Sequence, residues 1–168
     1  MPTPRNAMGF TQSSSGNLYA IGGFNGSGTF PSAFFNEVDE YDPISDSWVI
    51  KTPMPTPRFS LGLATGLNGK LYAIGGSTSD GSCINTVEEY DPVSDHWTTK
   101  TPMSTARCTL AVVTAPNGKI YAIGGHTDNR IGNSHLATVD EYDPINNTWT
   151  TKSPMHFARS TLGATINS

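Results

Sequence analysis

The chain has little charge, no basic excess and no long apolar run. Only 14% of its 168 residues are charged and the formal net charge is −4, so we expect no nucleic-acid partner. No apolar run approaches the ~20 residues that a membrane helix needs, so we expect no membrane partner. The first ten residues, MPTPRNAMGF, carry no apolar signal core, which favours a cytoplasmic location.

Cysteines and catalytic motifs are also scarce. Cys83 and Cys108 are too few for a disulfide framework or a zinc cluster, and we interpret them as isolated thiols, although a disulfide between them stays open. His126, His135 and Asp128 fall in one loop, but their spacing matches no metal-ligand motif. There is no phosphate loop, nucleophile elbow or H-E-x-x-H motif. We predict a protein that is not an enzyme, with no metal, no cofactor and no catalytic residue.

Glycine and proline, in contrast, are plentiful, and they fall in a repeat. Seventeen glycines and twelve prolines, with few helix-forming runs, suit short strands joined by turns. The segment LYAIGG occupies residues 18–23 and again 71–76, and IYAIGG occupies 120–125. All three tryptophans and four of the five arginines recur at intervals of roughly 50 residues. The recurrent arginines are Arg5, Arg58, Arg107 and Arg159.

Each repeat predicts four antiparallel strands, a to d. Strand a follows the arginine, and a turn such as Asn-Gly-Lys leads into strand b, which is LYAI or IYAI. The glycine pair ends strand b at a place that excludes a Cβ, through positive φ or a close neighbour. Strand c ends at Asp-Pro, a turn signal, and strand d carries the tryptophan. Four strands in roughly 50 residues are the period of a propeller blade.

The double glycine, the spaced tyrosine and the tryptophan make the chain similar to the kelch repeat family. The resemblance implies an all-β kelch-type β-propeller, with three four-stranded blades forming half of a ring. We expect blades over roughly 5–52, 58–101 and 107–153, with an extra first strand over 159–168. All six tyrosines fall at repeat positions, where we expect them to pack between blades. Because some kelch-like propellers are copper oxidases that need further tyrosine ligands, this placement argues against copper.

The connections between strands b and c differ from blade to blade and predict a binding face. They read FNGSGTFPSAFFN, STSDGSCIN and HTDNRIGNSHLA, whereas the a–b and c–d turns are short and alike. Variable loops on a repeating frame are where recognition is usually placed. The phenylalanines in the first loop form either an interaction patch or a local mini-core. The candidate ligand-binding residues in these loops are Phe24, Asn25, Phe30, Phe34, Asp80, Ser82, His126, Asp128, Arg130 and His135.

The four recurrent arginines lie at the same predicted end and have two interpretations. They either receive an acidic ligand or form ion pairs within the blade with the recurrent Glu40, Glu89 and Glu141. We favour the structural role. In kelch-type adaptors of ubiquitin ligases, arginines at the corresponding position help bind acidic peptides, so the resemblance keeps Arg5, Arg58, Arg107 and Arg159 as candidate ligand residues.

The leading functional hypothesis is a non-enzymatic module that binds a protein or peptide, an acidic one where the arginines contact it. The alternatives are a sugar-binding or sugar-processing propeller, as the resemblance allows, and a half-propeller whose role is self-assembly. Propellers close with about 4–8 blades, so three blades leave two apolar faces open. We therefore predict a homodimer that closes a six-bladed ring, with a longer chain of six or seven blades as the rival.

Overall fold

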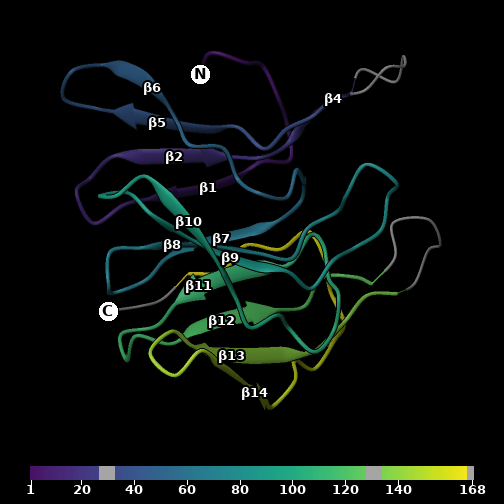
Figure 1. Cartoon of the computed structure of the whole chain (residues 1–168). Helices are drawn as coiled ribbons and strands as arrows, with labels where there is room; N and C mark the ends of the chain where they lie inside the picture. The colour runs from purple at the N-terminus through teal and green to yellow at the C-terminus, as the bar shows by residue number, and fades with distance from the viewer. Residues whose placement is uncertain (27–32, 128–133, 166–168) are drawn as a thin grey trace.

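Three four-stranded antiparallel sheets follow one another along the chain in the computed structural model, which describes residues 1–26, 33–127 and 134–165 (Figure 1). The first sheet contains β1 (Gly9–Gln12), β2 (Leu18–Ile21), β5 (Val38–Asp42) and β6 (Ser47–Lys51). The second contains β7 (Gly62–Thr65), β8 (Leu71–Ile74), β9 (Val87–Asp91) and β10 (His96–Lys100). The third contains β11 (Ala111–Thr114), β12 (Ile120–Ile123), β13 (Val139–Asp143) and β14 (Thr148–Lys152).

The sheets confirm the predicted all-β fold of three blades. We call them blades 1, 2 and 3; strand β7 of blade 2 lies between β1 and β11, so the first strands form the inner edge. A two-stranded ribbon, β3 (Phe24–Asn25) with β4 (Ala33–Phe34), stands in the b–c connection of blade 1. Among the described residues there is no helix, and hence none long and apolar enough to cross a membrane.

The hydrophobic core lies between neighbouring blades. One buried cluster combines Tyr19 and Ile21 of blade 1 with Tyr90 and Trp97 of blade 2, and a second joins blade 2 to blade 3 in the same way. The rings of Tyr19 and Tyr90 are 6.0 Å apart. Burial, with help from nearby carboxylates, raises the pKa of the phenols in these clusters. The aromatic repeat positions are therefore inter-blade packing positions, as predicted.

The glycine pair is required because the next blade's arginine approaches it closely. A Cβ on Gly22 would lie 2.4 Å from the carbonyl oxygen of Arg58, and both Gly22 and Gly23 have positive φ. The amide of Gly23 donates to that same carbonyl at 2.9 Å. Both reasons predicted for the glycines, positive φ and a close neighbour, therefore apply at this site. The junctions of Gly75–Gly76 with Arg107 and of Gly124–Gly125 with Arg159 repeat this geometry.

Each junction arginine belongs to two blades at once. The backbone of Arg58 bonds to blade 1, since its amide donates to Phe35 and its carbonyl accepts from Gly23. Its guanidinium bonds to blade 2, where it contacts Glu88 at 2.7 Å and the carbonyl of Ala73 at 3.1 Å. The side chain has no exposed surface. The arginine thus ties one blade to the next.

The predicted carboxylate partners of the arginines are wrong by one residue. Arg5 pairs with Asp39 at 2.7 Å, Arg58 with Glu88, and Arg107 with Asp140. Neighbouring residues of a strand point to opposite faces, so the next residue along points away from the arginine. The carboxylates that point away form ion pairs with lysines instead; they are Glu40, Glu89 and Glu141. The favoured structural role of Arg58 and Arg107 is correct, but with the other recurrent acid.

The expected extra strand over 159–168 differs in the structure. Residues 159–165 form no strand, and Arg159 makes one isolated bridge with Leu136; residues 166–168 lie outside the described residues. A strand there needs a second strand beside it, and the three sheets have already used the second strands of this chain. The segment is docked at Arg159 and by one further backbone hydrogen bond, from the amide of Thr161 to the carbonyl of Thr109 at 2.9 Å.

We expect loss of the buried ion pair to destabilise the fold strongly. Replacing Glu88 by Gln, or Arg58 by Met, leaves one charge of the pair buried without its partner, and we expect each to lower the free energy of unfolding by about 3–5 kcal/mol. The double variant should lose less than the sum. Denaturant unfolding curves measure all three.

The control is the half-buried pair of Lys152 with Glu141, in which both side chains keep contact with solvent. Lys152→Ala should change stability by no more than about 1 kcal/mol. Equal losses for the buried pair and the half-buried pair would contradict the bridging role of Arg58.

Candidate functional site

The b–c connections lie beside the arginine-bearing d–a connections at one end of the blades. Isolated bridges join Asn6 to Phe24, Phe59 to Ser77, and Cys108 to His126. In each pair, the residue after the recurrent arginine meets the residue after the glycine pair. We call this end, formed by residues 24–26, 33–36, 77–86, 126–127 and 134–137 with the d–a connections, the loop face. It contains those predicted loop candidates that the structure describes.

Aromatic rings fill the corner between blades 1 and 2. Phe24 and Phe34 face each other across the β3–β4 ribbon, with ring centroids 6.2 Å apart. Phe59, from the start of blade 2, packs 4.8 Å from Phe24 and 5.6 Å from Phe34. Of the two alternatives for these phenylalanines, this geometry is that of a local mini-core. Asn25 is exposed beside it, and Phe30 lies outside the described residues.

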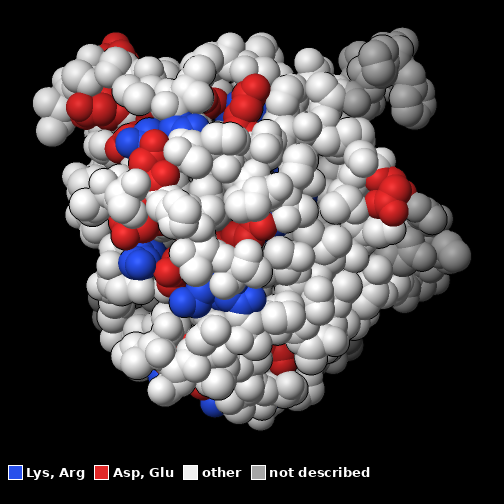
Figure 2. Space-filling model, viewed as in Figure 1, with Lys and Arg blue, Asp and Glu red and all other residues white. Residues whose placement is uncertain are grey.

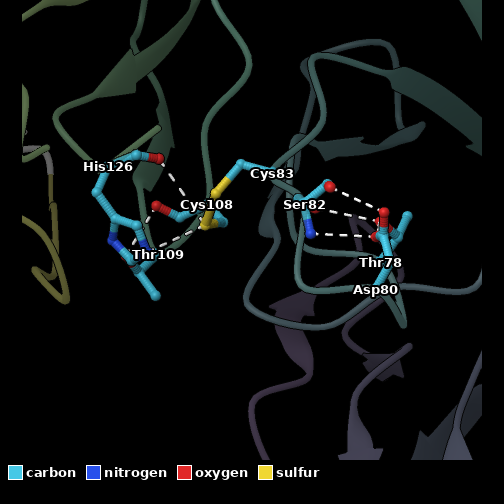
Figure 3. The surroundings of a disulfide bond; sticks show 7 residues. All are labelled: Thr78, Asp80, Ser82, Cys83, Cys108, Thr109 and His126. Atoms are coloured by element: carbon cyan, nitrogen blue, oxygen red, sulfur yellow. Dashed lines mark hydrogen bonds between the residues drawn. A yellow bond between two sulfur atoms is a disulfide. The ribbon is translucent and has the colours of Figure 1, made fainter. Parts of the chain in front are cut away.

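Asp80 and Ser82 organise the b–c connection of blade 2. The carboxylate of Asp80 accepts from the hydroxyl of Thr78 at 2.6 Å and from the amide and hydroxyl of Ser82 at 3.1 and 2.9 Å (Figure 3). Side-chain acceptors of this kind hold a turn in shape. Both residues stand in the loop as predicted, with Asp80 and Ser82 exposed to solvent.

The corner between blades 2 and 3 contains a disulfide, so the interpretation of two isolated thiols is wrong. Cys83 of the b–c connection bonds to Cys108, the residue after Arg107, with Sγ atoms 2.06 Å apart (Figure 3). The cysteines are 25 residues apart in the chain, but the blade junction places their Cα atoms within 5.3 Å. Cysteine count alone could not show this proximity, whereas their positions in the repeat could have.

Two histidines lie beside the disulfide at the same corner. His126 lies with Nε2 3.2 Å from Sγ of Cys108, and its ring is 6.1 Å from that of the exposed His135. The structure therefore brings together His126 and His135, which the sequence placed in one loop. Asp128 and Arg130, predicted for the same loop, lie outside the described residues.

The recurrent arginines are not displayed at the loop face. The side chains of Arg5, Arg58 and Arg107 have no exposed surface, whereas Arg159 is exposed. Burial lowers the pKa of the Arg58 and Arg107 guanidinium groups, and the facing carboxylates Glu88 and Asp140 counteract this. In this structure only Arg159 of the four can meet a ligand from solvent.

A pocket that sequence reasoning missed lies at the opposite end of the blades. It has a volume of about 640 Å³ between the turns of blades 1 and 2, and Ser14, Glu40, Asn68 and Lys70 contribute to its lining. Burial opposes ionisation of Glu40, but hydrogen bonds from Asn17 and Tyr19 and the charge of Lys51 outweigh it and lower its pKa. The turns that form the pocket are alike in every repeat, so variation between blades could not reveal it.

Charges on the surface are paired rather than gathered by sign. Figure 2 shows basic and acidic side chains side by side on the face in view. The contacts include Lys70 with Glu89 and Asp91, and Lys119 with Asp143 at 2.6 Å. The described residues thus offer mixed, locally neutralised charge.

Comparisons with known proteins agree with this architecture. The model of the kelch motif matches three times, over residues 12–55, 58–104 and 107–156. Kelch-like protein 35 of Mus musculus is 39% identical over 66 residues, which are 39% of this chain and 10% of that protein. The influenza virus NS1A-binding protein homolog of Mus musculus is 37% identical over 86 residues, 49% of this chain and 12% of that protein.

A solved structure shows the same fold over nearly the whole chain. The structure of YjhT superposes with a TM-score of 0.79 at 19% identity, over 95% of this chain and 55% of the YjhT chain. The chain thus spans about half the length of that structure and about a tenth of the matched curated relatives. With three motif matches, one in each blade, the chain belongs to the kelch-repeat family.

Proposed function

We propose that this chain is a non-enzymatic kelch module that binds a protein or peptide at its loop face. One observation carries the proposal: equivalent corners of the frame hold different chemistry. Phenylalanine rings fill the corner between blades 1 and 2, whereas a disulfide and an imidazole fill the corner between blades 2 and 3. Recognition surfaces on repeat proteins vary in this way above a constant scaffold.

The constant parts of the blades are already engaged in holding the frame. Arg58 forms an ion pair with Glu88. The hydroxyl of Tyr72 donates to Glu89, and the hydroxyl of Tyr90 donates to Asp95. These polar groups already have partners within the frame and are poorly placed to bind a ligand. The exposed part of the loop face, including Asn25, Ser82 and His135, is where blades differ and where side chains meet solvent. One mouse relative is named a homolog of an influenza virus NS1A-binding protein, and this name supports a binding role.

A sugar-binding role is the second candidate, and the pocket at the turn end favours it. Hydroxyl, amide, carboxylate and ammonium groups line that pocket, through Ser14, Asn68, Glu40 and Lys70. Such groups hydrogen-bond sugar hydroxyls well. Tyr19 also lines the pocket but is only 1% exposed, so it presents almost no ring surface for a sugar to stack on. This lack of an aromatic platform leaves the peptide hypothesis first.

Screening of the full chain against a displayed peptide library and a glycan array tests the two candidates. We expect the library to yield peptides that bind the chain. Ser82→Trp should weaken their binding at least tenfold, because the larger side chain would occupy part of the loop face. Val93→Trp, an equally bulky change at the exposed turn end, is the control and should leave peptide binding unchanged. Glycan binding that only Val93→Trp weakens would favour the sugar hypothesis and contradict the loop face.

We further propose that a second copy of the chain is a partner, because both ends of the three-blade arc offer unused junction surface. Inside the chain, the Nε1 atoms of Trp97 and Trp149 donate to the carbonyls of Thr52 and Thr101 in the preceding blade. Trp48 holds the same position in blade 1, and the described residues form no blade before it. At the other end, Arg159 is exposed although its backbone is docked on blade 3.

The exposed arginine matches a carboxylate on the first blade of a second copy. The amide of Gly125 donates to the Arg159 carbonyl at 2.8 Å, as other glycines do at the internal junctions. At an internal junction the arginine's guanidinium enters the following blade. In a ring of two copies, the blade that follows Arg159 is blade 1 of the second copy, and the acid at the position of Glu88 and Asp140 is Asp39. Asp39 is held by Arg5 of its own chain at 2.7 Å. At each closing junction two arginines, Arg159 of one copy and Arg5 of the other, could pair with one Asp39. We propose that Arg159 takes the place of Arg5 there.

Mass in solution at micromolar concentration, with two arginine variants, tests this assembly. We expect twice 17.9 kDa for the parent chain. Arg159→Ala should weaken association at least tenfold, whereas Arg5→Ala, which frees Asp39, should not. A folded monomer of 17.9 kDa would contradict the dimer, and the same surfaces would then suit a following blade of a longer chain.

A further inference from the structure

The corner between blades 2 and 3 places three metal-ligating groups together. Cys83, Cys108 and His126 come from three separate segments, and one donor atom of each lies within 4.8 Å of the others. Figure 3 shows the imidazole of His126 directed at the sulfur of Cys108. Cys108 is buried, while Cys83 and His126 are half-buried, so the group is sheltered but reachable from solvent.

The hydrogen-bond geometry around His126 is compatible with the tautomer that binds a metal through Nε2. The hydroxyl of Thr109 donates to the carbonyl of Cys108 at 2.7 Å, which uses its single hydrogen. The same oxygen lies 2.7 Å from Nδ1 of His126 and can accept from a proton on that nitrogen. In that tautomer Nε2, which lies 3.2 Å from Sγ of Cys108, is the nitrogen that can bind a metal. Ligating histidines typically have their other nitrogen fixed in this manner.

The equivalent corner in the chain shows that the frame itself does not require these groups. Between blades 1 and 2, the positions of Cys108, His126 and Cys83 are occupied by Phe59, Ser77 and Phe34. There the rings of Phe34 and Phe59 pack against each other, with centroids 5.6 Å apart, in place of the two sulfurs. The blade junction therefore forms without two sulfurs and an imidazole, and these groups at the second corner are a feature of that corner alone among the two.

We propose that the reduced form of this corner binds one Zn²⁺ through Cys83, Cys108 and His126, and that the disulfide is its oxidised, metal-free form. Two thiolates and an imidazole are ligands that zinc prefers, and they offer no oxygen donors for Ca²⁺ or Mg²⁺. A fourth position of the tetrahedral ion is filled by water or another donor. This site does not depend on the proposed binding function.

The two forms interconvert by a balanced exchange. A dithiol reductant delivers two electrons and two protons to the disulfide, which yields two thiols, and the reductant becomes a disulfide itself. Zn²⁺ then displaces one proton from each thiol as both become thiolate ligands. In either form blade 2 stays tied to blade 3, through a sulfur–sulfur bond or through the ion.

Cobalt and zinc titrations of the full chain, reduced with a dithiol that is then removed without air, test the site. Co²⁺ reports directly, because thiolate ligands give charge-transfer absorption and tetrahedral geometry gives strong visible bands. We expect one Co²⁺ per chain, displaced by one Zn²⁺, and no such bands for the oxidised protein. The Zn²⁺ affinity is measured by competition with a chromogenic chelator.

Variants separate these ligands from other histidines. Cys83→Ser and His126→Ala should each weaken Zn²⁺ at least about tenfold and diminish the cobalt bands. His96→Ala, at an exposed position on β10, is the matched control and should change neither. Circular dichroism checks that each variant is folded. A reduced, folded parent chain that gives no thiolate–cobalt absorption would overturn the proposal, as would zinc affinity unaffected by Cys83→Ser.

Discussion

The contact on which the other features depend is the approach of an arginine carbonyl to the glycine pair of the preceding blade. Gly75 leaves room for the Arg107 carbonyl, which would lie 2.4 Å from a Cβ there, and the amide of Gly76 bonds to it. With its backbone fixed against one blade, the arginine extends its guanidinium into the next blade, where Asp140 neutralises it. Backbone and side chain of one residue thereby set the position of two sheets, and the apolar clusters fill the space between them.

This arrangement separates the frame from the surface that can vary. The residue after each arginine emerges at the loop face beside the residue after each glycine pair, as Phe59 does beside Ser77 and Cys108 beside His126. The backbone at these corners is held by the junction, so the side chains are free to differ without loss of the fold. One corner is an aromatic cluster, and the next holds a disulfide with an imidazole in contact. A module with constant blades and variable corners suits recognition, and its open edges suit assembly.

The repeat predicted the frame because glycine, tyrosine and tryptophan positions are each imposed by packing that recurs in every blade. The repeat did not predict features that depend on which of two adjacent residues points toward a given neighbour in space. Glu88 and Glu89 are both recurrent acids, but strand alternation directs only Glu88 to Arg58. The disulfide depends on how closely one blade's loop meets the next blade's first residues, which a count of cysteines cannot show. The segment from Arg159 lacks a strand because pairing needs a partner, not only a suitable sequence.

The central claim, that close approach to the glycine pair fixes neighbouring blades, is tested by two glycine variants. Gly16 and Gly75 both have positive φ, but a Cβ on Gly16 meets nothing within 4 Å. Gly16→Ala should therefore cost only the backbone strain, about 1–2 kcal/mol in the free energy of unfolding. Gly75→Ala adds a clash with the Arg107 carbonyl, and denaturant unfolding should show a further loss of about 1–3 kcal/mol. Equal losses for the two variants would contradict the account.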